Sequence, residues 1–263
     1  MKLKRIALGA IIGISFWGCK KNSSEESAEQ RALQDDTYAA TAIISVEGMA
    51  NELEFIARQA PLADQSASFL SCANIEKQNV SEGQKIEITF NSNIACSDKT
   101  YRSGKLSLMY YTNGAITVTP QNYAIESTLI NGVFTFQNMT GSQNNYMALD
   151  VPDGKFTLST GAYIKFSISR ESAVKAGSST ADLSDDVIEI KNAQYDLNVF
   201  NLFTNTLIQG STNVPYNLKY SCSDKFRPRT GKILYHRMGA DSRYIDFGNG
   251  TCEAVPVLSE VIK

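Results

Sequence analysis

The stretch Lys85-Ile86-Glu87-Ile88-Thr89-Phe90 alternates polar and apolar side chains. Successive side chains of a β-strand point to opposite faces, so this period of two indicates a half-buried strand. Similar alternation recurs in short runs at residues 106–110, 133–136 and 164–168. Several short alternating runs in one chain are typical of a sandwich or barrel. We therefore predict an all-β fold, an antiparallel β-sandwich with one N-terminal helix.

The runs are separated by dipeptides that favour tight turns. They are Asn113-Gly114, Asn131-Gly132, Asp153-Gly154 and Asn249-Gly250. Such pairs tolerate the positive φ angles of hairpin turns, so we expect hairpins at these positions. The β-domain should cover residues 61–263, with two related halves at about 61–170 and 185–263. The polar, Ser/Ala/Gly-rich segment 171–184 is expected to be the loop between the halves.

An amphipathic helix is predicted over residues 36–60, with Asp36 as its N-cap. Gly48 interrupts the helix at a cost of about 1 kcal/mol relative to Ala. Apolar residues recur at spacings of three and four and form one stripe. The stripe consists of Tyr38, Ala42, Val46, Met49, Leu53, Ile56 and Ala60. Packing on the β-domain and binding to a partner helix would both explain it, and we favour packing on the domain.

Residues 1–18 have the three parts of a secretion signal. Cationic residues at positions 2, 4 and 5 precede an apolar core at 6–17, and Gly18 ends the segment. A spanning helix needs about 20 apolar residues, which this core does not reach. The small residue followed by Cys19 resembles a lipobox. Cys19 is thus the predicted lipidation site and first mature residue, and the polar segment 19–35 the predicted flexible tether.

The mature chain is acidic. Removing Lys2, Lys4 and Arg5 with the signal leaves 22 basic residues against 27 acidic ones, a net charge of −5. This balance argues against nucleic acid as a partner, because phosphate binding needs a basic face. The expected partner is a membrane, reached through the N-terminal lipid. We expect the outer membrane, at its periplasmic or cell-surface face.

Four further cysteines occur, at positions 72, 96, 222 and 252. An even number in an exported chain indicates disulfides, which allow three connectivities here. A structural zinc site favours closely spaced Cys pairs, and none is present. Cys72 and Cys96 bracket strands and a tight turn, as do Cys222 and Cys252. This arrangement favours pairing Cys72 with Cys96 and Cys222 with Cys252.

A second internal similarity cuts across these pairs. Cys96-Ser97-Asp98-Lys99 leads to Arg102-Ser103-Gly104-Lys105. Cys222-Ser223-Asp224-Lys225 leads to Arg229-Thr230-Gly231-Lys232. A duplicated ligand site that uses Lys and Arg is one interpretation. A recurring turn at the entry to a strand is the other, and we favour it.

In these residues the chain resembles a family of lipoproteins of the Bacteroidota type, whose activity is not established. The resemblance covers residues 36–258. It lies in the Cys, Arg-x-Gly-Lys and Asp-Phe-Gly-x-Gly-Thr-Cys elements, the last at residues 246–252. Phe90-Asn91 departs from the family's usual Phe-Gly. The resemblance implies lipid anchoring and no particular chemistry.

The residues that could support catalysis form no recognisable set. His236 is the only histidine, and no G-x-S-x-G motif supplies a nucleophile for a triad. Paired carboxylates could hydrolyse glycosides. The candidates are Asp98 with Asp224, and Asp185 with Asp186. Most such residues lie in solvated turns, so we assign no catalytic residue.

Ligand sites are also weakly marked. The run Asp246-Phe247-Gly248-Asn249-Gly250 offers oxygen ligands for calcium but lacks the EF-hand pattern. A hairpin turn explains it equally well, so no metal site and no cofactor are predicted. Tyrosines could form a sugar-stacking platform, although we expect most of them in the core or its rim. These are Tyr101, Tyr110, Tyr111, Tyr123 and Tyr146.

Together these features predict a lipid-anchored cell-envelope protein with a non-catalytic binding or structural role and an unknown ligand. A glycan or an envelope protein is the candidate partner. One alternative is an envelope glycan hydrolase that uses carboxylates. Another is a subunit of a larger outer-membrane complex that binds its neighbour through the helix stripe.

Overall fold

The computed structural model of the chain describes residues 28–62, 70–138, 146–177, 183–200, 205–224 and 226–260. The helices are α1 (Ala28–Gln59) and the short 3-10 helix η2 (Leu183–Asp185). The strands are β1 (Ala73–Val80), β2 (Gly83–Phe90), β3 (Arg102–Tyr111), β4 (Ala115–Ile125), β5 (Thr128–Asn131), β6 (Phe134–Asn138), β7 (Tyr146–Thr157), β8 (Tyr163–Ala176), β9 (Val187–Phe200), β10 (Asn205–Val214), β11 (Tyr216–Lys219), β12 (Thr230–Arg237), β13 (Arg243–Asn249) and β14 (Val257–Glu260). The predicted signal segment, Cys19 and the first part of the predicted tether lie outside the described residues.

All fourteen strands belong to one hydrogen-bonded sheet with antiparallel pairing. The main path runs β1-β2-β3-β4-β5-β7-β8-β9-β10-β12-β13-β14, while β6 pairs with β4 and β7, and β11 pairs with β9. Almost every strand therefore pairs with its neighbour in the sequence. The predicted all-β class and the antiparallel pairing are confirmed.

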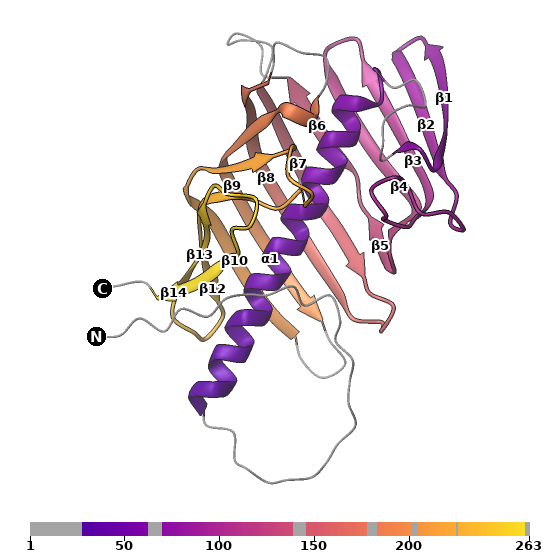
Figure 1. Ribbon diagram of the computed structural model, residues 1–263. Helices are drawn as coiled ribbons and strands as arrows, with labels where there is room; N and C mark the ends of the chain where they lie inside the picture. The colour runs from indigo at the N-terminus through magenta and orange to yellow at the C-terminus, as the bar shows by residue number, and fades with distance from the viewer. Residues whose placement is uncertain are drawn as a thin grey trace.

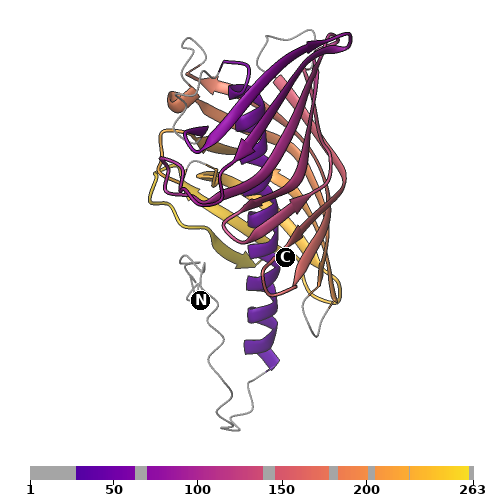
Figure 2. The ribbon, with the colours of Figure 1, turned by 90° about the vertical axis from the view of Figure 1, so that its right-hand side faces the viewer.

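The sheet curves around the single long helix. Figures 1 and 2 show α1 lying along the concave side, with the arms of the sheet bending around it. Twisted sheets of more than about ten strands curl, which explains why one sheet can enclose a core. The layers expected of a sandwich are thus two arms of one continuous sheet, with the helix between them.

The interior is formed by one face of the sheet and most of α1. Five members of the predicted helix stripe are at most 4% exposed, and Tyr38 and Met49 pack against the same core. The stripe therefore packs on the β-domain and is not available as a whole to a partner helix. No helix among the described residues is long and apolar enough to cross a membrane.

Several local predictions were wrong. The helix begins at Ala28, eight residues before the expected start, so residues 28–35 are helical and not part of a flexible tether, and Asp36 lies inside the helix and is not its N-cap. Residues 171–176 continue β8 and are not part of a loop. Asp153-Gly154 lies within β7 at a register shift and makes no hairpin. At Gly154 an added Cβ would lie 2.2 Å from the ring of Phe166, so close packing, not a turn, requires glycine there.

The other turn signals lie where strands end. Asn113-Gly114 connects the paired strands β3 and β4, as predicted. Asn131-Gly132 links β5 to β6, which pair with β4 and β7 and not with each other, so the hairpin predicted there was wrong. Asn249-Gly250 ends β13 shortly before Cys252 and is not a two-residue hairpin, since β14 begins only at Val257.

Candidate functional site

The interface between α1 and the sheet contains buried ion pairs. Arg170 of β8 lies 3.0 Å from Glu47 and 2.8 Å from Glu54, and the three side chains are at most 1% exposed. Ser172 donates a hydrogen bond of 2.6 Å to Glu54, and Arg58 of the helix adds an ion pair at 2.7 Å. Burial opposes ionisation of Glu54, but the charges of Arg58 and Arg170 outweigh it and lower its pKa. These groups join helix to sheet.

Two further arginine clusters hold the helix at other points. Arg102 of β3 donates from Nε to Glu52 at 2.8 Å. Near the other end of the described helix, Asp36 pairs with Arg243 at 2.8 Å and with Arg237 at 3.3 Å. Buried acids on a helix need such partners, because an unpaired buried charge is strongly unfavourable.

Buried tyrosine hydroxyls complete this interface. Tyr195 donates to Glu47 at 2.8 Å and lies 2.6 Å from the hydroxyl of Tyr216, while Tyr123 donates to Glu52 at 3.2 Å. Burial raises the pKa of all three tyrosines well above its ordinary value. They therefore stay protonated and act as hydrogen-bond donors in the core.

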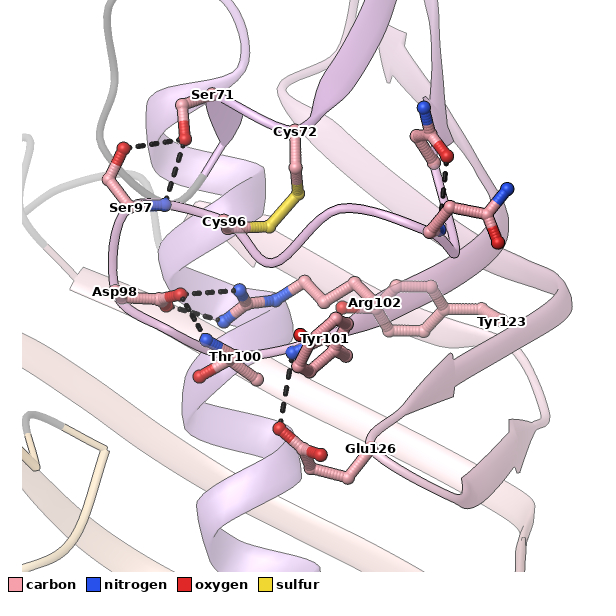
Figure 3. The surroundings of a disulfide bond; sticks show 12 residues. Ser71, Cys72, Cys96, Ser97, Asp98, Thr100, Tyr101, Arg102, Tyr123 and Glu126 are labelled. Atoms are coloured by element: carbon pink, nitrogen blue, oxygen red, sulfur yellow. Dashed lines mark hydrogen bonds and ion pairs between the residues drawn. A yellow bond between two sulfur atoms is a disulfide. The ribbon is translucent and has the colours of Figure 1, made fainter.

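The two disulfides pair as predicted, Cys72 with Cys96 and Cys222 with Cys252. Figure 3 shows the first beside Asp98 and Arg102, whose guanidinium donates to both carboxylate oxygens at 3.0 and 2.8 Å. In the second motif Arg229 donates to the backbone carbonyl oxygens of Cys252 and Asp224. The two arginines are 1% and 0% exposed. Arg102 binds its own loop and Glu52 of the helix, and Arg229 binds its own loop and the disulfide-bonded Cys252, which fits a recurring turn at a strand entry.

The duplicated glycines have the same role in both motifs. Gly104 and Gly231 have φ angles of +80° and +86° and lie at register shifts in β3 and β12. An added Cβ would lie 2.0 Å from the Asn122 carbonyl oxygen or 2.4 Å from that of Pro215. In each case the glycine bulge packs against the backbone of the residue that precedes a tyrosine. The ring of that tyrosine contacts a phenylalanine ring. These contacts join Tyr123 with Phe90 and Tyr216 with Phe247.

The carboxylates considered for hydrolysis have local partners. Asp98 binds Arg102, and Asp224 lies 3.2 Å from Arg227 within its own loop. Asp185 is exposed in η2, whereas the adjacent Asp186 is 2% exposed. The structure therefore does not bring Asp185 and Asp186 to one surface.

The tyrosines considered for sugar stacking do not share one surface. Tyr123 is buried, and Tyr110 donates to the carbonyl oxygen of Ala57 in the helix at 2.8 Å. Tyr101 and Tyr111 flank opposite ends of β3, and Tyr146 begins β7. The proposed platform is absent from the described part of the chain.

The segment considered for calcium forms a strand end. Asp246 accepts a hydrogen bond of 2.9 Å from the Gly248 backbone and pairs with Lys232 at 3.0 Å. Asn249 accepts from the Thr251 backbone at 3.3 Å. Among the described residues, no group of three or more His, Cys, Asp or Glu is arranged to hold a metal ion.

A groove of about 490 Å³ crosses β8, β9, β10 and β12. Its polar side chains alternate along each strand with core residues such as Phe166, Leu197 and Ile208, so they lie on the face turned away from α1. The strands that carry it are consecutive neighbours in the sheet, in the order β8-β9-β10-β12 (Figure 1). The groove thus lies on the outer face of the sheet.

Two cross-strand rows form its lining. The strand register places Ser167, Asp196, Gln209 and His236 in one row. The next row contains Lys165, Asn198 and Leu207, with Met238 beside Leu207 through a backbone hydrogen bond of 3.1 Å. Gln209 donates to Asp196 at 2.9 Å, which fixes both side chains. Leu207 and Met238 are 41% and 67% exposed, unusually open for aliphatic side chains.

The polar row does not assemble a catalytic triad. β10 separates His236 on β12 from Asp196 on β9. Both β10 and β9 separate His236 from Ser167 on β8. Since neighbouring strands lie about 4.8 Å apart, the backbones of His236 and Ser167 are about 14 Å apart. A nucleophile and its base must approach within hydrogen-bond distance, and this row keeps them apart.

Sequence patterns alone did not indicate the groove. In the sequence His236 stands alone as a histidine, and Asp196, Gln209 and Asn198 belong to no motif. Strand alternation places them on the outer face, but only the pairing of β9 with β8 and β10 brings them into adjacent rows.

Comparison of the chain with models of protein families, with curated proteins and with solved structures finds no match.

Proposed function

We propose that this chain is a lipid-anchored protein of the bacterial cell envelope with a non-catalytic binding role, and that the outer-face groove is its binding site. The observation that carries the binding role is the groove itself. It sets a row of hydrogen-bonding side chains beside exposed aliphatic ones, as binding sites do. The buried arginine and carboxylate groups serve the helix–sheet interface.

The anchor is argued from the sequence. A cationic segment, a short apolar core and the Gly18-Cys19 pair favour processing at Cys19. Two acyl chains on this residue would give stable membrane attachment. Eight residues separate Cys19 from the start of α1, and an extended chain spans at most about 3.5 Å per residue. The helix would then begin within about 30 Å of the membrane surface.

The two disulfides support an exported location, because such bonds persist in oxidising compartments.

Metabolic labelling with an alkyne fatty acid, with and without Cys19→Ser, tests the anchor. The natural chain should carry label and sediment with outer membranes, and the variant should lose both. A natural chain that stays unlabelled and soluble would overturn the anchored location.

Binding without turnover is tested separately. The purified chain should bind an envelope ligand and release it unchanged in mass. Cleavage of that ligand, lost when one carboxylate is replaced, would instead establish a hydrolase.

A further inference from the structure

The charges around the groove argue against an anionic ligand. Asp153 and Asp196 contribute carboxylates, and Lys165 is the cation among the lining residues. Phosphate, sulfate and nucleic-acid ligands are held by clusters of arginine and lysine, which this lining does not provide. An acidic ligand would meet repulsion from two exposed carboxylates.

The hydrogen-bonding groups suit hydroxyls. A hydroxyl both donates and accepts, and so do the side chains of Asn198 and Gln209, while the imidazole of His236 can donate. Asp196 adds an acceptor that Gln209 holds in place at 2.9 Å. Such a row can satisfy several neighbouring hydroxyls of a ligand without requiring a charge on it.

The exposed aliphatic pair supplies the complementary surface. Leu207 and Met238 lie in the row next to the polar one, so a ligand with one polar edge and one carbon-rich face can contact both rows. Four strands at a spacing of about 4.8 Å give the rows a length of about 14 Å. This length exceeds a single sugar ring and suits a short chain of them.

We propose that the groove binds a neutral oligosaccharide, with its hydroxyls on the row of Asp196 and its carbon-rich face on Leu207 and Met238. The inference rests on the binding role proposed above and names its ligand class. The ring of Tyr163 does not stack on the sugar in this proposal. Phe200 stacks on it with 4.5 Å between ring centroids, and Lys155 Nζ lies 4.5 Å from the ring centre.

The test uses the full mature chain in detergent and isothermal titration with three neutral probes, the hexasaccharides of cellulose, starch and xylan. At least one should bind saturably, with a dissociation constant below about 10 mM. Asp196→Ala and Leu207→Asp should each weaken that binding about tenfold, the loss expected for one charge-assisted hydrogen bond or one apolar contact.

Asp150→Asn is the matched control. Asp150 is an exposed carboxylate of β7 that lies on the outer face of the sheet but outside the groove lining. It should leave the dissociation constant unchanged. Saturation-transfer NMR on the bound sugar should also show contact from Leu and Met methyl protons. Equal losses in the control and in the groove variants would overturn the site.

Two further probes separate this inference from the proposed function. Hexalysine that binds in an Asp196-dependent manner, while none of the three sugars binds, would overturn the oligosaccharide assignment and leave the groove as a binding site. Absence of binding by all three sugars and by hexalysine would likewise overturn the assignment. The location of the Cys19→Ser variant reports on the anchor independently of either result.

Discussion

Arg170 donates a hydrogen bond of 2.8 Å to Glu54 across the interface between β8 and α1, and both side chains are buried. The two residues lie 116 positions apart in the sequence. Arg170 also pairs with Glu47, so one guanidinium binds two acids on the same helix, while Arg58 supplies a second cation to Glu54. This group fixes the position of the helix within the curved sheet.

Removing Arg170 should therefore be costly. Arg170→Met removes the cation paired with buried Glu47 and one of the two cations paired with buried Glu54, and should lower the free energy of unfolding by about 3–5 kcal/mol. Adding Glu47→Gln and Glu54→Gln should restore most of the loss, because no buried carboxylate then lacks a cation and only the partly exposed Arg58 loses its partner. Urea denaturation of the single and triple variants measures both. A triple variant less stable than Arg170→Met would contradict this account.

Stability should fall in acid. Arg58 and Arg170 lower the pKa of Glu54 below its ordinary value of 4.5 despite burial. A group with a depressed folded pKa contributes fully above the unfolded value and loses that contribution as pH falls through the folded one. Urea midpoints measured below about pH 4.5 should thus decrease, and Glu54→Gln should flatten the decrease. The exposed Asp150→Asn is the control, and an unchanged slope in Glu54→Gln would refute the assignment.

The bulge at Gly104 should not accept a side chain. Gly104→Ala combines a positive φ with a clash against the Asn122 carbonyl oxygen, and should cost more than about 2 kcal/mol. Gly239→Ala is the matched control, with a φ of +82° and nothing within 4 Å of the new Cβ. It should cost only about 1 kcal/mol. Similar losses for both would show that the backbone conformation alone matters at Gly104.

Gly48→Ala should stabilise the protein, in contrast to Gly104→Ala. Gly48 lies inside α1, and a Cβ there would meet nothing within 4 Å. Alanine is favoured over glycine in a helix interior by about 1 kcal/mol, so thermal unfolding should shift upward by a few degrees. A lower melting temperature would mean that this part of the helix needs the freedom of glycine.

Each disulfide should contribute measurably to stability. The bonds close loops with sequence separations of 24 and 30 residues, for which chain entropy predicts about 3 kcal/mol each. Cys72→Ser with Cys96→Ser should lower the free energy of unfolding by about that amount. Non-reducing peptide mapping checks the pairing, and a peptide linking Cys72 to Cys222 would contradict it.

Much of the fold was predictable because it is local. The alternation of Ile86, Ile88 and Phe90 identified a strand from its neighbours alone, and the spacing of cysteines favoured the observed pairing. The start of the helix was missed because Asp36 resembles an N-cap locally. In the structure Arg237 and Arg243, about 200 positions away, bind its carboxylate inside the helix.

The sequence by itself determined the all-β class, the long helix and the disulfide pairs, since each depends on periodicity or spacing within a short segment. Only the tertiary structure decided that the strands form one curved sheet around α1 and that Arg102 and Arg170 pair with acids of the helix. It also decided that Asp196, Gln209 and His236 share an outer groove. These features depend on which strands become neighbours, and strand pairing brings together residues whose separation along the chain carries no local pattern.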